Sequence, residues 1–115
     1  MVTALVLFGV AALGGLILAT QRLRGAPRPT LALALVHGAV AAAGLVALIL
    51  VVVEAGAPPV AKTALVVFLV AALGGFYLIA QHLQTKPLPV PVMLIHAAVA
   101  VAGFLILLAG VLKLA

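Results

Sequence analysis

Apolar residues fill four long stretches of the chain, and the acidic and basic residues fall only between these stretches or beyond the last of them. The stretches are Val2 to Gln21, Thr30 to Val53, Thr63 to Gln81 and Pro87 to Leu112. A helix rises about 1.5 Å per residue, so about 20 apolar residues cross a hydrocarbon core of about 30 Å. The pattern therefore predicts four transmembrane helices.

Helices rather than strands are expected because backbone polar groups in lipid must be satisfied within the segment. The four stretches do not alternate polar and apolar residues, as the strands of a membrane barrel do. The first stretch lacks the basic start of a cleaved signal peptide, and we keep it as a helix. We expect an all-α integral membrane protein, with residues 1–115 forming a single membrane domain in an up-down-up-down four-helix bundle.

The composition agrees with this class. Hydrophobic residues make up 69% of the chain and charged residues 6%, with a mean hydropathy of +1.57. A water-soluble domain needs more polar surface than this. The chain has no cysteine, which excludes disulfides, thiolate metal sites and c-type haem attachment. Its net charge of +5 comes from residues at the ends of the stretches, where membrane topology explains it better than nucleic-acid binding.

An internal repeat runs through the chain. A shift of 60 positions aligns residues 3–29 with 63–89 at sixteen identities in 27. After a one-residue gap, residues 35–48 align with 94–107 at eight identities in 14. The chain is therefore interpreted as a duplicated helical hairpin, with repeat one at 2–54 and repeat two at 62–113. Each repeat crosses the membrane twice, so the repeats are expected to be parallel and related by an axis along the membrane normal.

The basic residues predict an orientation. The two loops within the hairpins carry four of them: Arg22, Arg24, Arg28 and Lys86. The opposite side carries Lys62, Lys113 and the only acid, Glu54. The positive-inside rule then places both hairpin loops in the cytoplasm and both termini outside the cytoplasmic membrane.

One histidine lies at matching positions in each of two otherwise uncharged stretches, His37 in the second and His96 in the fourth. Both are expected at the same depth, about 10 Å inside the membrane from the hairpin loops. A stripe of small residues continues along each histidine's helix face. These residues are Ala41 and Gly44 in the first repeat and Ala100 and Gly103 in the second.

Two interpretations fit the histidines and the small residues. In the first, small residues let the helices approach closely and each imidazole forms a hydrogen bond to a neighbouring helix. In the second, the missing side-chain volume holds a planar cofactor, and the two imidazoles are the axial ligands of a b-type haem. The sequence does not distinguish haem from a chlorin or a quinone.

Further polar residues lie near the predicted hairpin-loop boundary. Gln21 and Gln81 are expected to be interfacial caps, or else donors to haem propionates or to a quinone carbonyl. Arg22 and Arg24 are near enough to pair with propionates, although topology explains them as well. His82 has no histidine counterpart in the first repeat and is expected to be an interfacial cation or a propionate neighbour.

Nothing in the sequence indicates an enzyme, because there is no buried carboxylate and no pairing of a nucleophile with a base. The length and helix count resemble those of small multidrug resistance transporters, which carry a membrane-embedded glutamate in their first helix. The Val2 to Gln21 stretch has no acid, which disfavours proton-coupled drug export.

The sequence thus favours a haem b electron-transfer subunit in the lipid bilayer, working with a quinone or a redox-protein partner. The alternatives are a cofactor-free structural or accessory subunit of a larger membrane complex and a small transporter or channel. The further partners expected are other copies of the chain in a homo-oligomer or the other subunits of a larger membrane complex.

Overall fold

The computed structural model describes residues 1–115 and consists of four helices with no strands. The helices are α1 (Val2–Leu23), α2 (Leu31–Val52), α3 (Pro59–Leu83) and α4 (Val90–Val111). Each is long and apolar enough to cross a membrane. The prediction of an all-helical chain with four candidate membrane spans is therefore confirmed.

Two helix starts differ from the edges of the apolar stretches because of proline. Helix α3 begins at Pro59, one turn before the predicted start at Thr63, with Pro58 as its N-cap. Proline suits the first helical turn, where its missing N–H would have no intrahelical partner. The charged Lys62 therefore lies within α3. Helix α4 begins at Val90, after an extended Pro89, rather than at Pro87.

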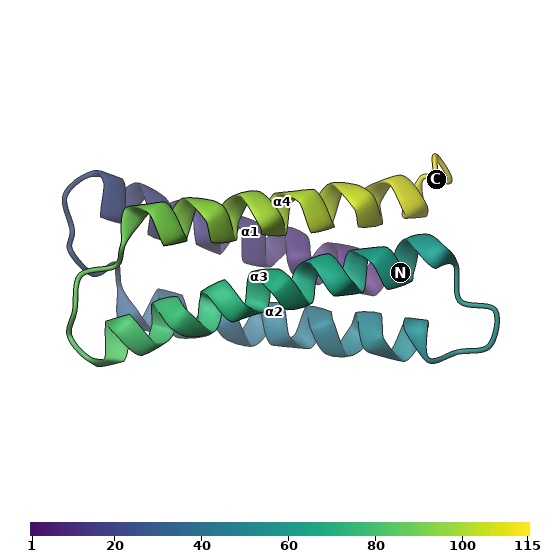
Figure 1. Ribbon diagram of the computed structural model, residues 1–115, viewed down its shortest axis with the longest axis horizontal. Coiled ribbons are helices and arrows are strands. Elements are labelled where there is room, and N and C mark those ends of the chain that lie inside the picture. The colour runs from purple at the N-terminus through teal and green to yellow at the C-terminus, as the bar shows by residue number, and fades with distance from the viewer.

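The helices form an elongated bundle of 45 × 21 × 19 Å. The loops after α1 and α3 lie at one end, here called the hairpin-loop end, while both termini and the α2–α3 link lie at the other, the terminal end (Figure 1). Helix α1 packs closely on α2, and α3 packs closely on α4; α1 with α4 and α2 with α3 make less extensive contacts. The bundle is thus two tight hairpins placed side by side.

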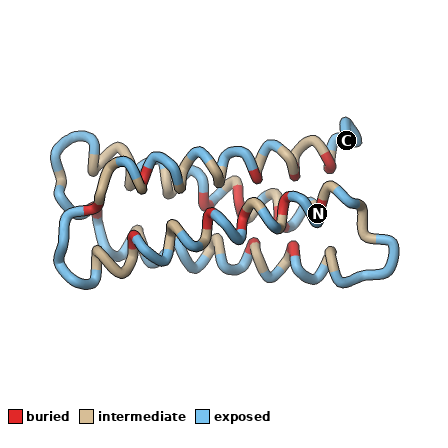
Figure 2. The backbone as a smooth tube through the Cα atoms, viewed as in Figure 1, coloured by how far each residue is buried: buried red, intermediate tan, exposed pale blue.

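Much of the bundle is exposed (Figure 2), and its exposed residues include many large apolar side chains. Leu13 and Leu73, at equivalent positions of α1 and α3, are 66% and 69% exposed. In water an apolar surface of this size would drive association, whereas in lipid it is the surface that a membrane helix presents. The exposed surface therefore agrees with a lipid bilayer environment.

The interior holds two separate apolar clusters. The larger one fills the terminal half of the bundle and consists of Ala4, Phe8, Leu48, Ala61, Ala64, Phe68 and Leu107. In this cluster the Phe8 and Phe68 rings stack across the bundle with centroids 3.7 Å apart and planes within 5°. The smaller cluster, at the hairpin-loop end, consists of Leu78, Leu88 and Met93. Both histidines lie between the two clusters.

Candidate functional site

His37 and His96 face each other across the middle of the bundle. They lie on α2 and α4, which are not neighbouring helices, and each is the seventh residue of its helix. The ring centroids are 6.3 Å apart and the ring planes are nearly perpendicular, at 85°. The structure therefore brings together the two histidines that the sequence singled out.

Each imidazole is fixed by a hydrogen bond to the other helix of its own hairpin. Nδ1 of His37 lies 2.7 Å from the Ala11 carbonyl oxygen, and Nδ1 of His96 lies 2.7 Å from that of Ala71. A carbonyl oxygen only accepts, so Nδ1 donates and carries the proton of the neutral ring. Nε2 of each ring then bears a lone pair, and it makes no hydrogen bond within the protein.

Two pairs of glycines provide the space in which the imidazoles lie. A Cβ atom at Gly15 would lie 3.0 Å from Cε1 of His37, and one at Gly75 would lie 3.2 Å from Cε1 of His96. Gly14 and Gly74 lie beside the first side-chain atoms of the same histidines. Glycine at these positions therefore lets each imidazole lie directly against the backbone of the neighbouring helix.

An apolar cavity of about 600 Å³ adjoins the histidines. Its walls include Ala41 and Ala100, one turn beyond His37 and His96. The stacked rings of Phe8 and Phe68 bound it toward the terminal end, and Pro29 and Leu88 bound it toward the hairpin loops. Binding sites for small molecules have volumes of about 300–1,000 Å³ and mostly apolar walls, so this cavity has the size and character of a ligand site.

Gly44 and Gly103 do not line this cavity. A Cβ atom at Gly44 would lie 3.1 Å from the Phe8 ring, and one at Gly103 would lie 3.1 Å from the Phe68 ring. The flat groups that lie against these two glycines are therefore phenylalanine side chains. In each stripe of small residues, the alanine borders the cavity and the glycine lies against one ring of the aromatic stack.

Gln21 and Gln81 also lie outside the cavity. Oε1 of Gln21 accepts a hydrogen bond of 2.9 Å from the backbone N–H of Thr30, the N-cap residue of α2. Gln21 thus links the end of α1 to the start of α2, while the Gln81 side chain makes no hydrogen bond within the protein.

Hydrogen bonds tie the two hairpin loops to each other. Nε of Arg22 donates to the Leu88 carbonyl oxygen at 2.9 Å, and Nε2 of His82 donates to that of Pro29 at 2.6 Å. The Leu88 N–H donates to the Pro27 carbonyl oxygen at 3.0 Å. Arg22 and His82 occupy aligned positions of the predicted repeat, and each side chain reaches the opposite loop. This role was not predicted from the sequence, because the two side chains differ.

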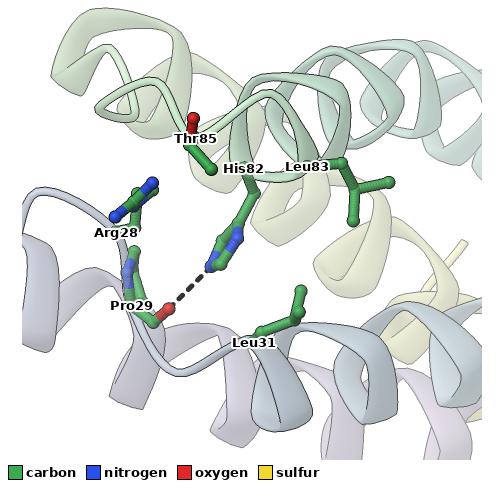
Figure 3. Close-up of a pocket in the computed structure, with 6 residues that line it drawn as sticks. All are labelled: Arg28, Pro29, Leu31, His82, Leu83 and Thr85. Carbon is green, nitrogen blue, oxygen red and sulfur yellow. Dashed lines mark hydrogen bonds between the residues drawn. The ribbon is translucent and has the colours of Figure 1, made fainter.

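A second, more polar pocket of about 370 Å³ lies at the same end, between the first hairpin loop and the end of α3 (Figure 3). Its lining residues are Arg28, Pro29, Leu31, His82, Leu83 and Thr85. Pro29 and His82 also line the larger apolar cavity, so the two spaces adjoin.

The donor set limits the chemistry of the histidine site. No group of three or more histidine, cysteine or acidic side chains lies close enough to hold a metal ion. Two imidazole nitrogens instead suit a metal whose remaining ligands come from a macrocycle.

No protein-family model, curated protein or solved structure matches this chain.

Proposed function

We propose that this protein binds haem b between His37 and His96 and serves as an electron-transfer subunit of the cytoplasmic membrane. The observation that carries the proposal is the pair of imidazoles 6.3 Å apart, with Nε2 of both rings unpaired beside an apolar cavity. Two imidazoles that each place a nitrogen about 2 Å from one iron ion have ring centres roughly 6 Å apart. The observed separation supports axial ligation from both sides.

The chain's own residues prepare this site in two ways. The carbonyl oxygens of Ala11 and Ala71 hold the histidine rings in the tautomer that leaves Nε2 free, and they increase the basicity of Nε2. The alanine and phenylalanine side chains around the cavity keep its interior apolar, which suits the apolar ring system of a macrocycle. Bound haem would supply a one-electron redox couple.

We further propose that the bundle is a duplicated hairpin of up-down-up-down topology, with the cofactor on the axis that relates the repeats. Contacts between equivalent residues support this proposal: Phe8 stacks on Phe68, and His37 faces His96. A ligand that lies on such an axis presents one face to each repeat, as bis-histidine ligation requires. The hairpin loops would face the cytoplasm and both termini the outside, and a quinone or a redox protein would exchange electrons with the cofactor.

Titration of the detergent-purified apoprotein with ferric haem tests the ligation. We expect one haem per chain and the optical spectrum of a six-coordinate low-spin complex. His37→Leu and His96→Leu should each remove one axial ligand and change that spectrum to a five-coordinate or high-spin form. His82→Gln is the control for the loss of a histidine that does not ligate the iron, and at saturating haem it should keep the low-spin spectrum because His37 and His96 both remain. A wild-type protein without a Soret band would refute haem binding.

One observation favours a second candidate, a cofactor-free structural subunit. The hydrogen bonds of His37 and His96 join the two helices within each hairpin, which is a sufficient packing role for a membrane histidine. In that case His37→Leu would lower the free energy of unfolding by roughly 0.6–2 kcal/mol, and added haem would not change the stability of the wild type.

A further inference from the structure

The polar pocket at the hairpin-loop end continues the apolar cavity along α3. His82 and Pro29 line both spaces. His82 lies seven residues beyond Gly75, the residue that contacts the His96 ring. Seven residues are about two turns of helix, or roughly 10 Å along the axis and on the same face. A planar ligand centred between the histidines would therefore point its edge toward this pocket.

The pocket offers the Arg28 guanidinium and one ring nitrogen of His82, which the protein itself leaves without a hydrogen bond. The Arg28 guanidinium is exposed and makes no hydrogen bond or ion pair with other residues. His82 is held by its Nε2 bond to Pro29, while its Nδ1 has no hydrogen-bond partner in the protein (Figure 3). The only acidic side chain of the chain, Glu54, follows α2 at the opposite end of the bundle. No carboxylate of the protein competes for these donors.

We propose that Arg28 and His82 bind a carboxylate of the ligand whose ring system lies in the apolar cavity. The inference rests on the proposed function, in which this ligand is haem and the carboxylate is a propionate. Arg28 donates from its guanidinium, and His82 donates from Nδ1 when its ring is doubly protonated while Nε2 keeps its bond to Pro29. The pocket thereby fixes the orientation of the ligand, with its acidic edge at the hairpin-loop end.

A phosphate of a lipid headgroup has the same oxyanion chemistry and is the competing occupant of this pocket. The ligand carboxylate is favoured because the pocket and the cavity adjoin at His82 and Pro29. A lipid headgroup would need no connection to the interior of the bundle. The two sources are separable because esterification removes the negative charges of haem and leaves its ring system intact.

The first arm of the test compares ferric haem with its dimethyl ester in titrations of the wild-type apoprotein in a nonionic detergent. Charge-assisted hydrogen bonds at a partly exposed site give roughly a tenfold difference in Kd, and we expect haem to bind more tightly by that factor. Equal affinities for haem and its ester would overturn this inference and leave the proposed function intact. Binding of neither compound would refute the proposed function itself.

The second arm uses matched charge variants. Arg28→Gln should abolish most of the preference for haem over its ester, whereas Arg24→Gln, an equal charge change in the same loop outside the pocket, should preserve it. His82→Gln should reduce the preference while keeping a donor for the Pro29 carbonyl. An unchanged preference in Arg28→Gln, together with loss of bound phosphatidylglycerol in native mass spectrometry, would assign the pocket to a lipid phosphate and overturn the inference. The ester comparison on the wild type decides the question even if a variant does not fold.

Discussion

Four glycines near the two histidines and the two stacked phenylalanines lie directly against an aromatic side chain. Gly15 and Gly75 are small because imidazole rings lie against them, and Gly44 and Gly103 are small because phenylalanine rings do. Gly38 lines the cavity yet has no atom within 4 Å of its Cβ position, and its counterpart in the second repeat is Ala97. Glycines of the same chain thus differ in what a methyl group would meet.

Replacement of these glycines by alanine tests this difference. Gly15→Ala would place its methyl carbon 3.0 Å from Cε1 of His37 and force the ring to turn away from its present position. Such a displacement costs about 0.5–1.5 kcal/mol, so we expect haem affinity to fall roughly two- to tenfold. Gly9→Ala is the control for the change in helix propensity, because Gly9 lies on the same helix outside the cavity and its Cβ position is 3.6 Å from the Phe104 ring; it should leave the affinity unchanged. Equal effects of the two substitutions would contradict the assigned contact.

Part of the site could be predicted at this scale. The repeat and the 1.5 Å rise of a helix were enough to place His37 and His96 at one depth, since both depend only on sequence position. The partner of Gly44 was not predicted, because helix periodicity defines a face but does not say which side chain of another helix lies against it. Phe8 and Phe68 are identical in the aligned repeats, and this was the available signal.

At the scale of helices, the structure consists of two hairpins, each joined internally by a histidine and joined to the other by aromatic and loop contacts. The Phe8–Phe68 stack connects α1 to α3 across the bundle, between helices that are not neighbours. Arg22 and His82 connect the loops at the other end. The start of α3 at Pro59 was not predicted, because Lys62 interrupts the apolar pattern although it does not interrupt the helix.

Removing one ring of the aromatic stack should weaken the association of the hairpins. In a membrane the separated helices remain in lipid, so Phe68→Ala loses packing rather than burial from water. We expect a loss of about 0.5–1.5 kcal/mol in the free energy of unfolding, measured by steric trapping in bicelles. Phe76→Ala is the matched control, because Phe76 is 68% exposed and should contribute little. Equal losses for both variants would contradict a stabilising stack.

At the scale of the whole molecule, the number of candidate membrane spans was predictable because hydrophobic length alone determines it. The orientation across the membrane is predicted from only a few basic residues in short loops. The bundle geometry does not test it, because that geometry is the same whichever side the loops face. Which pairs of helices make the most extensive contacts was not predictable either, because apolar helix faces in lipid have no strong preference among partners.

Cysteine labelling in intact cells measures the orientation. Single cysteines at Gln84 and Ala55 report the two ends of the bundle, and both positions are exposed. Gly25 and Gly56 are less suitable because their φ angles of 110° and 79° disfavour a side chain. We expect an impermeant maleimide to label Ala55→Cys in intact cells and Gln84→Cys only after lysis. The reverse pattern would place the hairpin loops outside.

Low-temperature electron paramagnetic resonance of the ferric haem complex tests the central claim most directly, because it reports both axial ligands and the relative orientation of their planes. Imidazole planes at 85° should give a strongly anisotropic low-spin signal in which one g value is large. A more rhombic low-spin spectrum would show two imidazoles in near-parallel planes and contradict the ring geometry. A high-spin ferric signal, or no signal from bound haem, would contradict ligation by His37 and His96.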